Sequence, residues 1–498
     1  MDTKEMNDSN AGFSRVSNDI STNQAWVKTS FANCHDVKIQ SLSFSGKEVF
    51  LVYCEGMCDT KRIDEVILPS IGKISQNLDS QWVENEILEN WHVVSLSREF
   101  DLNEINKQVL QGKLAVFFHG LQNAFLLEIA DPPKRTTEES STDVSIYGAK
   151  DGFVEELSDN VALVRKRLGT TTLSYEKFAI GKRGASNIGL LYIKDIIQPE
   201  LVEEIKERIS KVNIDAASGV DVIQEHLSDS PYSLLPLFHK TGWPDFVVES
   251  LLRGRFALIL DGSPTASIAP VNLMLLLKSA EDYNFPYYYV SFQRFLRLCG
   301  LLITLLLPGF YVAITLFHSD QIPLTLLATL VNAREGVPFP TSIECIVMLI
   351  LFELFREAGL RLPTSIGPTL SVVGGLIIGD AAIRAGLTSP SMLAVVATTA
   401  ISGFMINNLS LAGTISILRI YITLASSFLG IFGFFLSLFT ILIYMANTRS
   451  FGIPYLAPIS PVSFRDIATS VFRIPFSKIV RREKFLSPVD DTRRREDP

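Results

Sequence analysis

Acidic side chains interrupt strongly apolar stretches in the second half of this chain. Glu344 and Glu353 lie in the apolar run 341–355, and Asp380 directly follows the segment GGLIIG. A charge inside a lipid bilayer is costly and usually faces protein or water, so such residues are candidates for a functional site. Rings of carboxylates are one way in which proteins build a pathway for cations. The residue types therefore predict a cation path, with Glu344, Glu353 and Asp380 as its candidate residues.

Acids in the same region are also placed to form ion pairs within the protein. Glu353 precedes Arg356 by three residues, and Glu357 precedes Arg361 by four. Side chains at these spacings are neighbours on one face of a helix. Both interpretations stay open for these two pairs, whereas the sequence favours the cation path at the other two candidates.

No pattern typical of an enzyme or of a metal site occurs in the rest of the chain. The motifs GxGxxG, Walker A and GxSxG are missing, and the six histidines show no metal-ligand spacing. Cys54 and Cys58 have no second Cys or His pair nearby, so the five cysteines are interpreted as reduced thiols. We therefore predict a protein that is not an enzyme and that holds no cofactor and no metal.

The apolar residues, 47% of the chain, are concentrated after residue 290. Runs of this composition and length predict helices that cross a membrane. Four crossings are predicted, at 296–317, 366–385, 389–406 and 415–446. The segment 341–358 is expected to insert only partly, or to lie on the membrane surface as an amphipathic helix.

Charge predicts the orientation of these crossings. The N-terminus has no apolar signal segment, Arg294 and Arg297 precede the first crossing, and Arg449 begins a basic tail after the last one. Positive residues favour the cytoplasmic side. We therefore expect both termini in the cytoplasm, and a fifth crossing would place the basic tail outside.

The first 290 residues contain an internal repeat. LQGKLAVFFHG (Leu110–Gly120) and LRGRFALILDG (Leu252–Gly262) agree at four of eleven positions, and EVFLVYCEG (Glu48–Gly56) resembles NIGLLYIKD (Asn187–Asp195) at nearly the same offset. A helix, a tight glycine turn and a buried strand thus recur. The repeat predicts two similar α/β lobes, although any helix–glycine–strand junction has a similar pattern.

These observations predict an α/β cytoplasmic region of two similar lobes, followed by an all-α polytopic membrane domain. The expected parts are a disordered leader (1–35), a first α/β lobe (36–131), a linker (132–146), a second α/β lobe (147–290), a transmembrane helical domain (291–447) and a basic cytoplasmic tail (448–498).

Five stretches of the chain are distinctive: GRFALILDGSP, AREGVPFP, FREAGLRLP, VVGGLIIGDAAIRAGLTSP and RSFGIPYLAP. With these stretches, the chain resembles the A subunits of spore germinant receptors, the GerA family, from about Glu48 to Pro458. Three positions depart from the family pattern: Pro368 and Asp380 replace a usual Gln, and Asn407 replaces a common Pro. The residues that match the family motifs are Arg334, Glu335, Pro338, Pro340, Arg356, Glu357, Arg361, Pro363, Gly374, Gly375, Gly379 and Pro390.

The resemblance implies a multi-pass protein of the inner spore membrane with a cytoplasmic N-terminal region. It implies a complex with a permease-like B subunit that senses the nutrient and with a C subunit that is a lipoprotein. Family members are thought to form homo-oligomers that act as nutrient-gated cation channels, in contact with membrane lipid and not with nucleic acid. A carrier-type transporter would predict inverted repeats, which the sequence lacks. A membrane-anchored scaffold is the other alternative, although it needs only one span and no charge within it.

Overall fold

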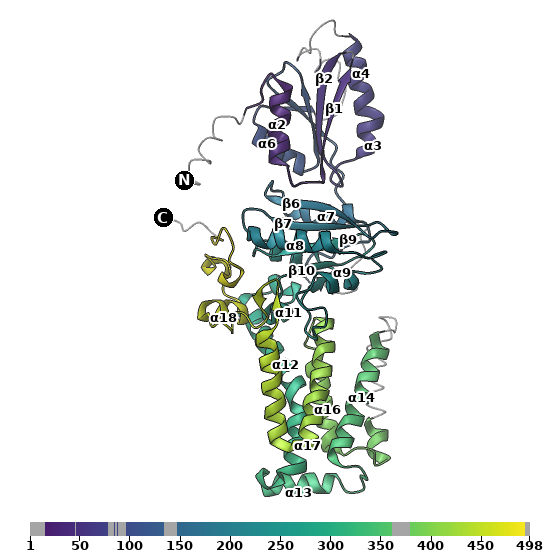
Figure 1. Ribbon diagram of the computed structural model, residues 1–498, viewed down its shortest axis with the longest axis vertical. Coiled ribbons are helices and arrows are strands. Elements are labelled where there is room, and N and C mark those ends of the chain that lie inside the picture. The colour runs from purple at the N-terminus through teal and green to yellow at the C-terminus, as the bar shows by residue number, and fades with distance from the viewer. Residues whose placement is uncertain are drawn as a thin grey trace. The chain divides into compact units, whose positions relative to one another are not determined.

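The computed structural model describes residues 15–44, 46–77, 84, 87, 96–133, 147–360 and 379–493 (Figure 1). Two compact units are present. The α/β unit comprises Met1–Pro231, Lys240–Pro270 and Val480–Pro498, and the helical unit comprises Tyr232–His239 and Val271–Ile479.

The α/β unit contains two five-stranded sheets with the same order of strands. The first sheet has the order β1-β2-β4-β5-β3 and the second has the order β6-β7-β9-β10-β8. Along the chain, the first, second, fourth and fifth strands of each sheet pair in the same antiparallel way. The strands are β1 (Val37–Phe44), β2 (Lys47–Cys54), β3 (Leu96–Glu99), β4 (Lys113–Phe118), β5 (Ala124–Glu128), β6 (Leu173–Ile180), β7 (Ser186–Ile193), β8 (His239–Thr241), β9 (Phe256–Leu260) and β10 (Ala266–Ala269).

The internal repeat recurs in the register and in the turns of the two sheets. Val49 of β2 lies opposite Phe118 of β4, and Ile188 of β7 lies opposite Leu260 of β9, which are matching positions of the repeat. The glycine before each central strand has a positive φ, +96° at Gly112 and +94° at Gly254. Since side chains with a Cβ rarely adopt this conformation, glycine allows the helix to end and the chain to turn into the strand.

The helices of the two lobes also follow the same order along the chain. The first lobe has α2 (Ile20–Ser30), α3 (Thr60–Arg62), the π-helix η2 (Ile63–Ile67), α4 (Leu68–Asn77) and α6 (Leu102–Leu110). The second lobe has α7 (Leu157–Arg167), α8 (Pro199–Lys211), α9 (Val220–Leu227) and α10 (Pro244–Leu251).

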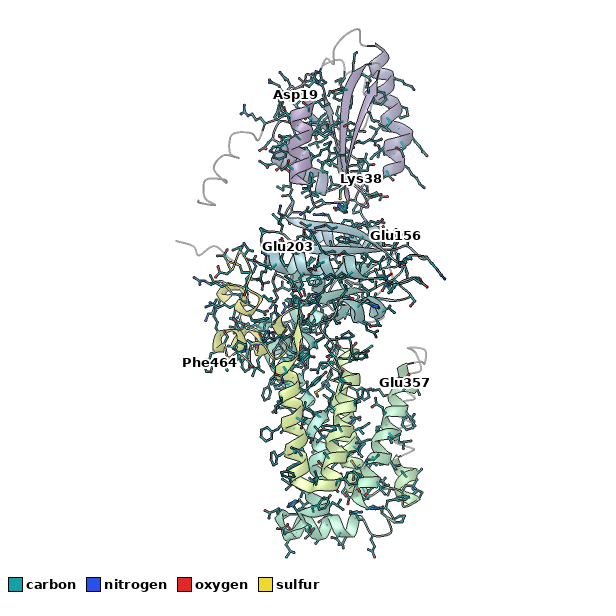
Figure 2. All side chains as sticks on the ribbon, viewed as in Figure 1. Asp19, Lys38, Glu156, Glu203, Glu357 and Phe464 are labelled. Atoms are coloured by element: carbon teal, nitrogen blue, oxygen red, sulfur yellow. The ribbon has the colours of Figure 1, made fainter. Side chains whose placement is uncertain are left out.

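The first helix of each lobe carries a buried asparagine that holds the preceding segment. The amide of Asn23 donates to the carbonyl of Ser17 at 2.7 Å and accepts from its N–H at 2.8 Å. Asn160 makes the same two bonds to Val154, at 2.6 and 2.8 Å. Figure 2 labels the N-cap residues of these two helices, Asp19 and Glu156.

Residues 15–35 therefore differ from the predicted disordered leader. They contain the first helix of the first lobe, α2, and Val27 of this helix is fully buried. The polar composition concealed this helix, because one of its few buried side chains is Asn23, which satisfies its amide on the backbone.

The sheet of the first lobe is covered on both faces. Ile67 of η2 and Ile71 of α4 pack in one apolar cluster with Leu114 of β4. Val27 and Ile105, of α2 and α6, pack in a second cluster with alternate residues of the same strands. Because strand side chains alternate between faces, a strand covered on both sides is apolar on both, as β4 is from Leu114 to Phe118.

A buried ion pair joins the two lobes. The guanidinium of Arg165 donates to both carboxylate oxygens of Asp36 at 2.9 Å, and both side chains are almost fully buried. Burial alone would lower the pKa of Arg165, but the Asp36 carboxylate outweighs it and the pKa is raised. The backbone of His35 donates to the carbonyl of Tyr175 at 3.0 Å, beside this pair.

The C-terminal segment Val480–Arg493 folds onto the second lobe. In the first lobe, the N–H of Asp131 donates to the carbonyl of Met57 at 2.9 Å, just after β5. In the second lobe, the N–H of Val489 donates at the same distance to Ile196, which is the residue that matches Met57. The C-terminal segment therefore occupies the position that the first lobe fills with its own next residues.

Ion pairs hold this C-terminal segment in place. The carboxylate of Glu483 lies 2.6 Å from Arg253 and 3.5 Å from Arg255, and Arg255 is 1% exposed. Glu249 pairs with both Arg253 and Arg493. The predicted tail is thus, from Val480 on, a structural part of the second lobe.

Within the helical unit, α12, α16 and α17 run side by side (Figure 1). The described elements of this unit are α11 (Leu273–Leu276), η3 (Ala280–Tyr283), α12 (Tyr287–Phe317), η4 (Ser319–Gln321), α13 (Leu324–Ala333), α14 (Thr341–Leu360), α16 (Pro390–Gly403), α17 (Leu409–Asn447), the paired strands β11 (Arg449–Ser450) and β12 (Ile453–Pro454), α18 (Phe464–Val471) and η5 (Phe476–Lys478); η6 (Lys484–Leu486) belongs to the α/β unit. Residues 379–384 are also helical.

Two of the described helices, α12 and α17, are long and apolar enough to cross a membrane by length and composition. They contain the predicted crossings 296–317 and 415–446. The predicted crossing 389–406 corresponds to α16, which has 14 residues and is shorter than a straight span of about 20. The crossing 366–385 lies outside the described residues up to 378. The segment 341–358 forms the 20-residue helix α14.

Candidate functional site

Glu344 lies in the first turn of α14 and is completely buried. Its Oε1 accepts hydrogen bonds from the N–H of Ser389 at 2.6 Å, from the Ser389 hydroxyl at 2.7 Å and from the Thr388 hydroxyl at 3.1 Å. Ser389 is the N-cap of α16. A carboxylate at a helix N-terminus is favourable because the free N–H groups there carry positive partial charge. Glu344 therefore fixes the beginning of α16 against the beginning of α14.

An arginine of the AREGVPFP motif lies on the other side of this carboxylate. Arg334 Nε is 3.7 Å from Oε2 of Glu344, and the guanidinium also donates to the hydroxyl of Thr341 and the carbonyl of Phe339. Oε2 of Glu344 and Nε of Arg334 are buried and have no hydrogen-bond partner. Two of the family-like stretches, AREGVPFP and the end of GDAAIRAGLTSP, thus meet at one buried acid.

Glu353 lies nine residues further along α14, about 13 Å along the helix axis. Its Oε1 pairs with Arg356, which is one of the two interpretations that the spacing of three residues left open. Its Oε2 accepts from Arg419 and from Ser416 of α17, both at 3.2 Å. Arg356 donates to the same serine at 3.1 Å. This group forms a polar connection between α14 and α17.

Asp380 is placed differently from the other two acids. It pairs with Arg384 at 2.8 Å, and the two side chains are 59% and 79% exposed. An exposed ion pair of this kind contributes little to stability. The three candidate acids are therefore not gathered in one cluster, and each lies beside an arginine.

The remaining motif residues fall into four groups. Pro340 precedes α14, where its carbonyl accepts from the N–H of Glu344 at 3.1 Å, and Pro390 is the first residue of α16. A Cβ at Gly379 would lie 3.1 Å from Leu393, so glycine allows a close approach there. Glu335 and Pro338 are exposed, and Glu357 is in the last turns of α14. The motif residues outside the described residues are Arg361, Pro363, Gly374 and Gly375.

Arg419 and Ser389 are the partners that the sequence analysis missed. Arg419 is the one charged residue in the run 415–446, and a lone charge in so long an apolar run signals a partner elsewhere in the protein. The distance of 66 residues from Glu353 left that partner undefined.

A second buried charge cluster lies at the start of α12. Asp282 is fully buried, its two carboxylate oxygens accept from Arg294 and Arg297 at 2.8 Å, and Arg473 donates to its backbone carbonyl. The two arginines that mark the predicted inner side of the membrane are thus held by one carboxylate.

Reactive thiols and metal clusters are not evident in the part of the chain that the structure describes. The cysteines are free, and burial raises the pKa of Cys58 to about 12, which keeps its thiol protonated. Among the described residues, no three His, Cys, Asp or Glu side chains are grouped to hold a metal ion.

Comparison with known proteins identifies the class. The model of the GerA family, described as Bacillus/Clostridium GerA spore germination protein, matches residues 25–485. This chain belongs to the GerA family of spore germination proteins.

Two individual relatives agree over nearly the whole length. The chain is 43% identical to spore germination protein XA of Bacillus anthracis, over 96% of this chain and 98% of that protein. It is 34% identical to the uncharacterized membrane protein YfkQ of Bacillus subtilis, over 93% and 91%. A solved structure that matches is the N-terminal domain of the A subunit of the Bacillus megaterium spore germinant receptor GerK3. The match has 27% sequence identity and a TM-score of 0.41, and it covers 52% of this chain and 96% of that structure.

Proposed function

We propose that this chain is the A subunit of a nutrient germinant receptor in the inner spore membrane. It acts with a permease-like B subunit that senses the nutrient and with a C subunit that is a lipoprotein. Several copies assemble through the helical unit into a nutrient-gated cation channel, and the resulting ion release triggers germination.

The observation that carries the channel proposal is the polar group of Glu353, Arg356, Ser416 and Arg419 between two apolar helices. The side chain of Glu353 is 32% exposed, whereas Arg419 is 7% exposed. Because charge is costly in lipid, the open side of this group must face other protein or water. In an oligomer, one such carboxylate from each chain would form a ring, which concentrates negative potential along the axis.

The C-terminal segment supports the proposed orientation. Residues on both sides of the helical unit, up to Pro270 and from Val480, fold into the same α/β unit. A chain that leaves and re-enters one folded unit must cross a membrane an even number of times. Four crossings with both termini in the cytoplasm satisfy this requirement, and a fifth crossing at 341–358 does not.

The experiment is potassium efflux from spores after nutrient addition, in a strain that carries Glu344→Gln, Glu353→Gln or Asp380→Asn in place of the natural chain. We expect Glu353→Gln to reduce efflux most, because its carboxylate is both partly exposed and deep in the helical unit. We expect Asp380→Asn to have the smallest effect, and Arg384→Gln is its matched control. Unchanged efflux in all three variants, at normal protein levels, would remove the support for an acidic path.

A non-conducting signalling scaffold is the second candidate function. The observation that favours it is that all three acids lie beside arginines, as expected for charges that connect helices. A scaffold predicts that Glu353→Gln and Arg419→Gln impair germination equally through loss of helix packing. A cation path predicts that Arg419→Gln, which exposes the negative charge, does not reduce conduction in the same way.

A further inference from the structure

The helix α18 buries two polar side chains and leaves an apolar side chain at its start exposed. Asp466 and Ser470 are buried, whereas Phe464 is 85% exposed. Val462 just before the helix and Phe472 just after it are exposed too. A helix on a water-soluble protein shows the opposite pattern, so this arrangement points to an apolar environment outside. Figure 2 labels Phe464, the first residue of α18.

The first turns of α12 show the same reversal. Arg294 is buried against Asp282, while Tyr287, Tyr288 and Phe292 are at least half exposed. Clusters of exposed aromatic residues are typical of the level at which a helix enters the lipid headgroups.

Hydrogen bonds connect the exposed residues around α18 with those in the first turns of α12. The N–H of Arg473 donates to the hydroxyl of Ser291 at 3.0 Å, and Arg294 donates to the carbonyl of Ser470 at 3.4 Å. The Arg473 guanidinium donates to the carbonyl of Phe285. The end of α18 is therefore attached to the beginning of α12, which is one of the two helices long enough to cross a membrane.

We propose that these residues form a membrane-interface anchor, in which α18 lies in the headgroup layer beside the entry of α12. The anchor comprises Tyr287, Tyr288, Phe292, Val462, Phe464 and Phe472. Its partner is the bilayer surface, and the inference rests on the membrane location proposed above. Apolar faces of such helices enter roughly 5–10 Å into the boundary between headgroups and acyl chains.

Continuity with α12 favours lipid over a protein partner as the occupant. The exposed aromatics of α12 pass directly into its exposed lipid-compatible residues, such as Leu302 at 46% exposure. Arg465, at the exposed start of α18, can reach the anionic headgroups while Phe464 enters the apolar layer.

The test uses the full chain in vesicles that contain phosphatidylglycerol and lipids brominated either near the headgroup or near the end of the acyl chain. Tryptophan replaces Phe464, and the fluorescence of the four natural tryptophans is subtracted with the unsubstituted chain. Leu302→Trp reports on the span, and Tyr147→Trp reports on an exposed position of the α/β unit. We expect Phe464→Trp to lose most of its emission with bromine near the headgroup and less with bromine at the chain end, and Leu302→Trp to show the reverse.

The outcomes separate this inference from the proposed function. Quenching of Leu302→Trp without quenching of Phe464→Trp would overturn the anchor and leave the membrane location intact. In that case, blue-shifted emission from Phe464→Trp shows that a protein partner covers α18, and red-shifted emission shows that this position of α18 is in contact with water. Absence of quenching at both sites would overturn the membrane location itself. Val462→Trp is the second variant, which keeps the test valid if Phe464→Trp does not fold.

Discussion

The two lobes of the α/β unit are built alike but are completed differently. Both have the same strand order, the same buried asparagine and the same glycine turn. In the first lobe, Ala130 and Asp131 pack beside Gly112 and Met57. In the second lobe, Pro488 and Val489 pack beside Gly254 and Ile196. A position that one lobe fills locally is filled in the other by residues more than 200 positions away.

This difference gives the second lobe a particular role. Its chain leaves β10 for the helical unit and returns at Val480 to complete it. The first lobe has no such connection to the end of the chain. Any displacement between the beginning and the end of the helical unit must therefore act on the second lobe, while the first lobe is connected to the second through contacts such as the buried Arg165–Asp36 pair and the bond from His35 to Tyr175.

Removal of the Glu483 carboxylate should produce the largest difference in stability between the two lobes. Glu483→Ala removes the carboxylate that pairs with Arg253 and with the buried Arg255, and loss of one partner of a buried pair costs about 3–5 kcal/mol. Hydrogen exchange should become faster in β9 of the second lobe and stay unchanged in β4 of the first. Arg481→Ala, in an exposed pair of the same segment, is the control and should change neither strand. Equal acceleration in both lobes would show that the C-terminal segment does not belong to the second lobe alone.

Alanine at the two matching glycines should destabilise the first lobe more than the second, which is the reverse of the effect of Glu483→Ala. Both substitutions impose about 1–2 kcal/mol for the positive φ. At Gly112 the new Cβ would also lie 2.5 Å from the carbonyl of Met57, whereas at Gly254 the nearest atom is 3.6 Å away. Thermal or denaturant unfolding should therefore show a larger loss of stability for Gly112→Ala. A larger loss for Gly254→Ala would mean that the C-terminal segment packs more tightly than its counterpart.

The smallest expected effect is a pH dependence limited to the second lobe. Burial alone would raise the pKa of Glu249, but Arg253 and Arg493 outweigh it and hold the pKa below its ordinary value. A lowered pKa contributes stability above the unfolded value of about 4.3, and this contribution is lost as the pH falls through the folded-state pKa. Hydrogen exchange in β9 should accelerate below about pH 4 in the natural chain. The Glu249→Gln variant should lack this acid-dependent component, and its persistence there would assign it to another group.

The sequence predicted the parts of this structure that depend on short spacings. The glycine turns and the buried strands follow from neighbours within one element, and the spacing of Glu353 and Arg356 left their ion pair open as one of two interpretations. The helix α2 was missed because only two of its three buried side chains, Ile20 and Val27, are apolar, and the third, Asn23, makes hydrogen bonds to the backbone. It carries a detectable signal, since Ser21, Asn23, Ala25 and Val27 recur as Ser158, Asn160, Ala162 and Val164.

Contacts between distant segments could not be predicted in the same way. In the second lobe, the chain after β10 continues into the helical unit and does not fill the position beside Ile196. Val489 can therefore return to that position. The partners of Glu344, which are Thr388 and Ser389, become neighbours only when α14 and α16 begin at the same place. Composition marked these residues as unusual, and tertiary packing decided their partners.

Cation conduction by the assembled receptor is measured most directly by electrical recording of the purified A, B and C subunits in liposomes. We predict a cation current that appears when nutrient is added and that Glu353→Gln reduces. An assembly that binds nutrient and contains all three subunits, but carries no current in the presence of nutrient, would contradict the proposed channel and leave the signalling scaffold as the function.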